Sequence, residues 1–202
     1  RYMIAGNVLR NGTYPISVSS ERIFQAIATI EYAKKIGAHA VAHGSTGAGN
    51  DQVRFDLTFQ ILAPDIEIIT PTRDLTLTRE YEINYLKERG YVADFKKMEY
   101  SINKGLWGTS IGGKETLKSE QTLPDSAYPS QITEEGPEKL TLTFEKGELK
   151  AVNGERIDDP VKAIQTVEAI GARYGIGRDM HIGDTIIGIK GRVGFEAAGP
   201  IL

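Results

Sequence analysis

The sequence predicts an α/β domain with a parallel sheet over residues 1–95, followed by an α+β domain over residues 96–202. Two observations predict this fold class. Helical and strand-like segments alternate as far as about residue 95, which is typical of a parallel sheet with crossover helices. After that point the chain is rich in Gly, Ser, Thr and Pro over residues 96–137, and a predicted hairpin and helix follow.

The first domain is expected to begin irregularly, because glycine, asparagine and proline interrupt residues 1–19. A helix should begin after Ser20, which can cap it, and should end at Gly37. The apolar residues of this helix recur at helical spacing and should face the core; they are Ile23, Ile27, Ile30 and Ala33. The elements that follow are predicted as strand 40–42, helix 50–62, strand 65–70 and helix 78–89, the last capped by Thr78.

The second domain is predicted to contain a hairpin, a helix and a last strand. Apolar and polar residues alternate over 140–144, and Lys146-Gly147 should turn the chain into a second strand over 149–152. A helix should follow Asp159 as its cap, with Pro160 at the first position. Its expected core stripe is Val161, Ile164, Val167 and Ile170. The last strand is predicted over residues 184–189.

The composition excludes several classes of protein. The net charge is −3 and no basic block is present, so nucleic acid is not expected as a partner. No apolar stretch approaches the roughly 18 residues that a membrane helix needs, so no membrane partner is expected. The absence of cysteine excludes disulfides, thiol catalysis and cysteine metal sites. We therefore expect a soluble cytoplasmic protein.

The histidines do not form a metal-binding pattern. His39 and His43 lie on a strand-like segment with no third ligand nearby, and His181 is isolated. We predict structural roles for all three and no metal site. Nothing resembles a Ser-His-Asp triad, and no residue is assigned as catalytic.

A glycine-rich run, Gly44 to Asp51, follows a predicted strand and opens a predicted helix. This context places free backbone N–H groups at the edge of the sheet where α/β proteins bind ligands. A Walker loop would end in Gly-Lys-Ser/Thr, and a dinucleotide fingerprint would need a glycine at Gln52, so both are excluded. Two interpretations stay open, namely a ligand-binding loop and a tight turn with a helix cap at Asn50.

The polar residues after the glycines favour a ligand. Asn50 and Arg54 share one face of the predicted helix, and Asp51 lies in its first turn. This set suits a zwitterion, because Asp51 can bind an ammonium group and Arg54 a carboxylate in bidentate fashion. The alternative for Arg54 is an exposed salt bridge, for example with Asp51.

The run His43 to Asp56, HGSTGAGNDQVRFD, resembles the glycine loop of argininosuccinate synthases. Three further segments resemble the same family in the same order and spacing. They are Tyr14–Ser19, the paired-serine segment Tyr100–Ser110, and Gly194–Glu196. This resemblance implies part of a parallel-sheet nucleotide-binding domain followed by part of an α+β synthetase domain.

The resemblance also implies ligands and activity. Citrulline would be contacted by Tyr14, Ser19, Asn50, Arg54, Ser101, Ser110 and Glu196. Aspartate would be contacted by Thr46, Asn50 and Asp51, and ATP, with Mg²⁺, by Gly44. Arg22 is a further candidate for citrulline, or it solvates the first helical turn. The implied protein is a cytoplasmic homotetramer that joins citrulline and aspartate through a citrullyl-adenylate.

The chain departs from the family pattern in several places. Ala48 stands where many relatives have lysine, and the paired-serine segment carries Asn103, Gly105 and Thr109 in place of commoner residues. The run over residues 192–196, Arg-Val-Gly-Phe-Glu, also differs. These differences indicate a divergent branch.

The family's phosphate loop and oligomerisation helix are expected outside residues 1–202, so we expect this chain alone to be inactive. Two other functions stay open. One is a non-catalytic amino-acid-binding or interaction fragment, and the other is a different adenylating ligase.

Overall fold

The computed structural model describes residues 2–18, 20–92, 100–188 and 190–202. The chain forms two compact units, each built from more than one segment. The first, here called the glycine-loop unit, comprises Ser20–Glu99 and Gly183–Lys190. The second, here called the sheet unit, comprises Arg1–Ser19, Tyr100–Ile182 and Gly191–Leu202. The predicted domain boundary at residue 95 stays a prediction.

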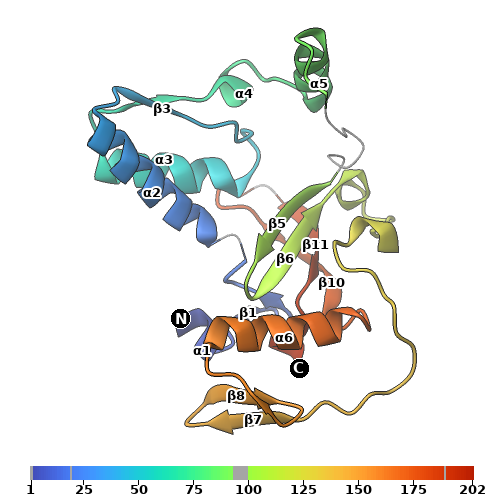
Figure 1. The fold of residues 1–202 in the computed structure, drawn as a ribbon. Coiled ribbons are helices and arrows are strands. Elements are labelled where there is room, and N and C mark those ends of the chain that lie inside the picture. Colours follow the sequence, from blue (N-terminus) through green and yellow to red (C-terminus); the bar gives the residue numbers. More distant parts are fainter. Residues whose placement is uncertain (1, 19, 93–99, 189) are drawn as a thin grey trace. The chain divides into compact units, whose positions relative to one another are not determined.

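The glycine-loop unit confirms the predicted alternation of helices and parallel strands (Figure 1). Its elements are α2 (Glu21–Ile36), β3 (Ala40–Ala42), α3 (Asn50–Leu62), β4 (Glu67–Ile69), α4 (Pro71–Asp74) and α5 (Arg79–Glu88). Strands β3 and β4 pair in parallel, with Val41 opposite Ile68. As predicted, Gly37 ends α2 in the left-handed conformation, and the Thr78 hydroxyl accepts from the Tyr81 N–H at the start of α5. Ser20 makes no capping hydrogen bond, because its backbone is already helical instead of extended.

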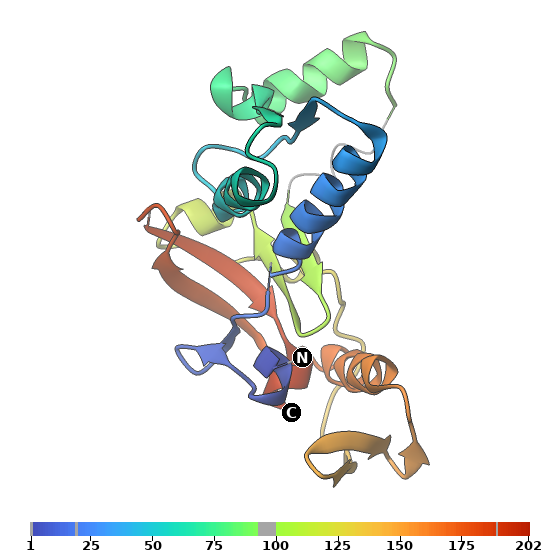
Figure 2. The same ribbon diagram turned by 90° about the vertical axis from the view of Figure 1, so that its left-hand side faces the viewer.

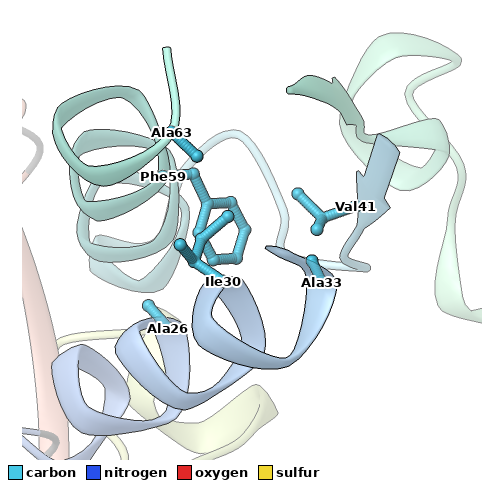
Figure 3. Close-up of a cluster of buried hydrophobic side chains, with 6 residues drawn as sticks. All are labelled: Ala26, Ile30, Ala33, Val41, Phe59 and Ala63. Atoms are coloured by element: carbon cyan, nitrogen blue, oxygen red, sulfur yellow. The ribbon is translucent and has the colours of Figure 1, made fainter. Parts of the chain in front are cut away.

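The core of this unit lies between α2, α3 and β3 (Figure 3). Its buried residues are Ala26, Ile30, Ala33, Val41, Phe59 and Ala63. The predicted stripe was wrong at Ile23, which is 36% exposed. The small side chains of Ala26 and Ala33 flank Ile30 and leave room for the Phe59 ring, so the buried face of α2 is centred on these residues.

The sheet unit contains a mainly antiparallel set of strands. A four-stranded sheet has the order β10-β11-β6-β5, and a smaller sheet has the order β7-β8-β9. The strands are β5 (Ser101–Gly105), β6 (Gly108–Gly112), β7 (Leu142–Glu145), β8 (Glu148–Val152), β9 (Glu155–Arg156), β10 (Arg178–Asp184) and β11 (Lys190–Glu196). The helices are α1 (Tyr2–Ala5), α6 (Pro160–Ala172) and α7 (Ala198–Ile201), and short 3₁₀ turns cover Lys114–Leu117 and Asp125–Ala127.

The predicted β7–β8 hairpin and α6 are confirmed, and the helix lies beside the hairpin (Figure 2). The two pack together through Val152, Ala163 and Val167. Lys146 and Gly147 both have positive φ (52° and 79°), as a tight hairpin turn requires. The Asp159 carboxylate accepts from the N–H groups of Val161 and Lys162. The predicted core stripe was wrong at Val161, which lies in the first turn of α6 and is 45% exposed.

Two further predictions for residues near this sheet were wrong. Residues 1–19, expected to be irregular, include α1 and the short antiparallel pair β1 (Leu9–Arg10) and β2 (Tyr14–Pro15). Of the expected strand 184–189, residues 185–188 form a turn between β10 and β11, closed by a hydrogen bond from the Gly188 N–H to the Thr185 carbonyl, and Ile189 lies outside the described residues. Gly188 has φ of 81°, which a strand residue would not adopt.

Gly177 allows the chain to approach itself closely before β10. Its φ is +76°, and an added Cβ would lie 2.3 Å from the Ala197 carbonyl oxygen. The Ala197 N–H donates to the Gly177 carbonyl at 3.0 Å, so the two backbones are held against each other. No larger residue fits here without moving one of them.

Among the described residues, no helix is long and apolar enough to cross a membrane.

Replacing Phe59 by alanine should destabilise the chain by about 3–5 kcal/mol, because it leaves a cavity between α2 and α3. The matched control is Phe24→Ala on the outer face of α2, where the ring is 69% exposed. The control should change the free energy of unfolding by less than about 0.5 kcal/mol. Urea unfolding followed by circular dichroism measures both, and equal losses would contradict the assignment of this core.

Candidate functional site

The glycine loop, residues 43–49, lies at the carboxyl end of β3. The His43 N–H donates to the Ile69 carbonyl at 3.1 Å, which extends the β3–β4 pairing to the first residue of the loop. Within the loop, the Gly49 N–H faces the Thr46 carbonyl at 3.4 Å. The loop then opens α3, as predicted, so its N–H groups stand at a helix N-terminus, where anions are favoured.

Asn50 is the first residue of α3 and does not cap it. Gly49, with an extended backbone, occupies the cap position, so the alternative of a helix cap at Asn50 was wrong. The Asn50 side chain instead reaches the turn after β10, where its Oδ1 accepts from the Ile186 N–H at 2.6 Å. This contact fixes the orientation of the Asn50 amide, because the oxygen must face the backbone donor.

Asp51 lies between two arginines. Its carboxylate accepts from Arg54 Nη1 at 2.8 Å and from Arg22 Nε at 3.3 Å. All three side chains are between 22% and 31% exposed, so solvent still reaches the cluster. The structure thus contains the Asp51–Arg54 salt bridge that was the alternative for Arg54, and it adds Arg22 from the start of α2. The cluster combines one anion with two cations beside the glycine loop.

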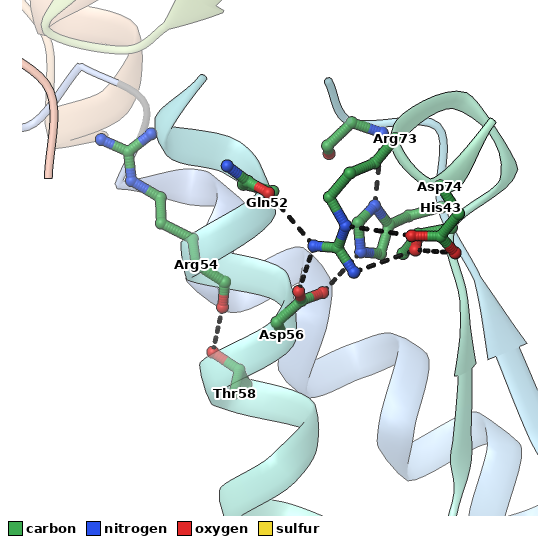
Figure 4. Close-up of polar contacts among 9 residues, drawn as sticks. His43, Gln52, Arg54, Asp56, Thr58, Arg73 and Asp74 are labelled. Carbon is green, nitrogen blue, oxygen red and sulfur yellow. Dashed lines mark hydrogen bonds and ion pairs between the residues drawn. The ribbon is translucent and has the colours of Figure 1, made fainter. Parts of the chain in front are cut away.

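His43 is paired with a carboxylate (Figure 4). Its Nε2 lies 2.7 Å from Asp56 Oδ1, and its side chain is 7% exposed. The Phe55 ring stacks on the imidazole at 5.4 Å between centroids. Among residues 2–18, 20–92, 100–188 and 190–202, no three His, Cys, Asp or Glu side chains are grouped as metal ligands.

The paired-serine segment is a β-hairpin, which the sequence did not predict. Ser110 lies opposite Phe195 in β11 and opposite Asn103 in β5. Residues directly opposite in antiparallel strands share a face, and alternate residues of one strand do too. Ser101 and Ser110 therefore lie on one face of the sheet, Ser101 exposed and Ser110 only 4% exposed.

Tyr14 covers the same face. Its ring packs edge-on against Phe195 at 5.2 Å and stacks on His181 at 4.4 Å, with 16° between the planes. Burial lowers the pKa of His181 below its ordinary value of 6.5, and the charge of Arg10 lowers it further. The neutral ring is thus the form that stacks on Tyr14. His181 and Phe195 were not predicted as site residues, because 167 or more residues separate them from Tyr14.

Glu196 lies on the opposite face, because it is paired with Thr109. Its Oε1 accepts from the Ser130 hydroxyl at 3.0 Å, and Arg178 Nε lies 3.9 Å from Oε2. Burial raises the pKa of this carboxyl above its usual range, while Ser130 and Arg178 oppose that rise. Arg178 in turn stacks over the Tyr128 ring at 4.3 Å. The structure thus separates Glu196 from the face that carries Tyr14, Ser101 and Ser110, and its contact with citrulline stays a prediction.

The predicted residues fall into two sets, one in each unit. Gly44, Thr46, Asn50, Asp51 and Arg54 come together around the glycine loop. Tyr14, Ser101 and Ser110 come together on the sheet. Ser19, also predicted to contact citrulline, lies outside the described residues.

Comparison with known proteins identifies the family. The family model described as "Arginosuccinate synthase N-terminal HUP domain" matches residues 2–92, and the one described as "Arginosuccinate synthase C-terminal domain" matches residues 100–202. The chain is 40% identical to the argininosuccinate synthase of Methanocaldococcus jannaschii over 202 residues, which cover 98% of this chain and 51% of that protein. It is 39% identical to that of Sulfolobus acidocaldarius (96% and 50% covered) and 38% identical to that of Xanthomonas campestris (94% and 49% covered).

The chain spans about half the length of the curated relatives that it matches. Both of its halves are matched by domains of one family, and these two domains follow one another in the order in which the family models name them. The chain belongs to the argininosuccinate synthase family.

Proposed function

We propose that the protein joins citrulline to aspartate with ATP, giving argininosuccinate, AMP and pyrophosphate. The observation that carries this proposal is the run His43–Asp56, which forms a glycine loop at the carboxyl end of β3 and places Asn50, Asp51 and Arg54 at the start of α3. Membership of the family supports it. ATP would enter as its Mg²⁺ complex. The cytoplasm and a homotetrameric assembly belong to the same proposal and rest on the resemblance.

The proposed reaction has two steps. The ureido oxygen of citrulline attacks the α-phosphorus of ATP, and pyrophosphate leaves to give citrullyl-AMP. The aspartate amine then attacks the ureido carbon, and AMP leaves with the oxygen. Neither step needs a protein nucleophile, so the protein would act by positioning the reactants and stabilising charge. Holding reactants in the right geometry can account for about 7–11 kcal/mol of a barrier.

In the glycine-loop unit, we assign Thr46, Asn50 and Asp51 to aspartate and Gly44 to ATP. Asp51 is suited to an ammonium ion because its carboxylate lies at the start of α3, where Arg22 and Arg54 hold it in place. Arg54 uses Nη1 for Asp51 and has further N–H groups for a ligand carboxylate. We assign Asn50 and Arg54 to citrulline as well, as the resemblance implies.

In the sheet unit, we assign Tyr14, Ser101 and Ser110 to citrulline, and the common face of these three side chains supports the assignment. Ser19 and Glu196 are assigned by resemblance alone. Tyr14 would be held for this role by the His181 and Phe195 rings.

One observation favours a second candidate function. The chain matches about half of each relative, and the family's phosphate loop is expected outside residues 1–202. An amino-acid-binding fragment without catalysis is therefore the alternative. It predicts binding of citrulline or aspartate with no turnover in any protein that contains this chain.

Replacing Asp51 by asparagine should lower kcat/KM for aspartate by roughly ten- to a hundred-fold, since a charge-assisted hydrogen bond contributes ~1.5–3 kcal/mol. Citrulline-dependent ATP–pyrophosphate exchange should survive, because activation of citrulline precedes aspartate. Both are measured on the full-length protein. Glu80→Gln, an exposed carboxylate in the first turn of α5, is the control. A lower melting temperature with unchanged aspartate kinetics would reduce Asp51 to an ion-pair partner of Arg22 and Arg54.

His181→Phe should remove a pH dependence of stability. The lowered pKa of His181 means that the unfolded chain binds more protons than the folded chain in the window just below pH 6.5. Stability is therefore complete above pH 6.5 and is lost as the pH falls through the folded-state pKa. Phenylalanine keeps the stack on Tyr14 but cannot titrate. Unfolding free energies measured between pH 7.5 and 5 should fall less in the variant, and parallel curves would contradict this account.

The 202-residue chain alone should form no argininosuccinate from citrulline, aspartate and ATP, whereas the full-length protein should form it and release AMP with pyrophosphate. The assay compares both at equal molar concentration. Turnover by the 202-residue chain would contradict this prediction, because it would show that residues within the chain bind the ATP phosphates. Release of ADP and phosphate by the full-length protein would rule out activation at the α-phosphate.

A further inference from the structure

We propose that Asp56 is a positioning residue that holds the glycine loop from two sides. One oxygen of its carboxylate acts through His43 on Ser45, and the other acts through Arg73 and Gln52 on Gly47. Figure 4 shows His43, Gln52 and Arg73 around Asp56. The proposed function gives no role to Gln52, Asp56 or Arg73. The consequence for aspartate binding rests on that function, whereas the effect on the loop does not.

The first connection fixes a histidine tautomer. The Ser45 N–H donates to His43 Nδ1 at 3.2 Å, so Nδ1 must be the unprotonated nitrogen of a neutral ring. The proton then lies on Nε2, which donates to Asp56 Oδ1 at 2.7 Å. Asp56 thereby stabilises the one tautomer that can accept from the loop.

The second connection fixes an amide orientation. Arg73 Nη1 donates to Asp56 Oδ2 at 2.5 Å and to Gln52 Oε1 at 3.1 Å. A guanidinium group only donates, so the Gln52 oxygen must face Arg73 and its NH₂ group must face away. That NH₂ group donates to the Gly47 carbonyl oxygen. Asp56 is thus connected to the Gly47 carbonyl through Arg73 and then Gln52.

Burial and neighbouring contacts keep this arrangement in place. Gln52 is 8% exposed, and the Thr70 hydroxyl, which accepts from Arg73 Nη2 at 2.9 Å, belongs to a residue that is 1% exposed. The hydrogen bond to Asp56 is the main cause of the raised pKa of Arg73. The stem of Arg73 also lies against the loop, since a Cβ added at Gly47 would be 3.6 Å from its Cγ.

The consequence is a loop whose backbone is oriented before a ligand arrives. Ser45 and Gly47 lie on either side of Thr46, which we assign to aspartate. Holding a Ser45 N–H and a Gly47 carbonyl therefore sets the position of the residue between them. Such pre-organisation reduces the ordering that ligand binding would otherwise require.

The test uses substitutions that separate the two connections. Asn at position 56 has one acceptor and one donor, so it can satisfy either His43 or Arg73 but not both. Asp56→Glu restores two acceptors and is the conservative rescue. His43→Asn keeps an acceptor near Ser45 and loses the donor to Asp56. His43→Gln keeps a donor to Asp56 and loses the acceptor near Ser45. Asp65→Asn, an exposed carboxylate just beyond α3, is the matched control.

Three quantities are measured by NMR on the full chain: hydrogen exchange of the Ser45 amide, the imidazole ¹⁵N shifts of His43, and the Kd for L-aspartate. In Asp56→Asn, the Ser45 amide should exchange roughly tenfold faster and L-aspartate should bind roughly tenfold more weakly, the effect of losing about 1.4 kcal/mol. The imidazole ¹⁵N shifts of His43 should no longer be those of the tautomer protonated at Nε2. Asp56→Glu and Asp65→Asn should retain the wild-type values, with exchange in α5 serving as the reference for global stability.

Unchanged Ser45 exchange and an unchanged His43 tautomer in Asp56→Asn would overturn the proposal. If that variant does not fold, the two His43 variants provide the test. Hydrogen exchange of the Ser45 amide should rise more in His43→Gln than in His43→Asn, and equal exchange rates would overturn the proposal. If L-aspartate does not bind the unsubstituted chain while Ser45 responds as expected, the positioning role holds and the proposed function is at fault.

Discussion

A glycine loop has few side chains with which to hold itself, and this constraint governs the glycine-loop unit. The first residue of the loop is fixed by β3, because the parallel pairing with β4 continues to His43. The last residue of the loop is fixed by the start of α3. Between these points it relies on groups from other elements. The short helix α4 supplies Arg73, and the second turn of α3 supplies Asp56. The packing of Phe59 against α2 matters to the site because it fixes α3, and with α3 the residues that face the loop.

The four-stranded sheet separates two environments by the simple alternation of its residues. One face carries aromatic rings and hydroxyl groups, with Tyr14, Phe195 and Ser110 close together. The other face carries Ile111 in an apolar cluster and, farther along, Glu196 with its partner Arg178. Burial of this carboxyl raises its pKa above the usual range, while the Ser130 hydroxyl and the charge of Arg178 oppose that rise.

Much of the glycine-loop unit could be predicted because its signals are local. Helical spacing, the Gly37 stop, the Thr78 cap and the glycine run each lie within a few residues, and the structure has each of them. The β5–β6 hairpin was missed because its Gly, Asn and Lys residues carry little strand propensity and the hairpin is ordered by β11, which is distant in sequence. The same limit applies to His181 beside Tyr14 and to Arg73 beside Asp56. Isoleucines 186 and 187 suggested a strand, but the neighbouring Gly188 adopts a conformation that ends one.

The register of β11 gives neighbouring residues opposite surroundings, with the Phe195 ring on one face and the Glu196 carboxylate on the other. Which of the two environments a side chain of β11 enters thus depends on the alternation of residues between the two faces of the sheet. Deleting one residue within β11 would turn an aromatic ring toward Arg178 and a carboxylate toward Tyr14, a mismatch that no rotamer change can repair. A change of length in the turn after Asp184 leaves each β11 side chain on the same face of the sheet, because the strand can keep its pairing with β6. Evolution of this family is therefore expected to vary the length of the turn while conserving the length of the strand.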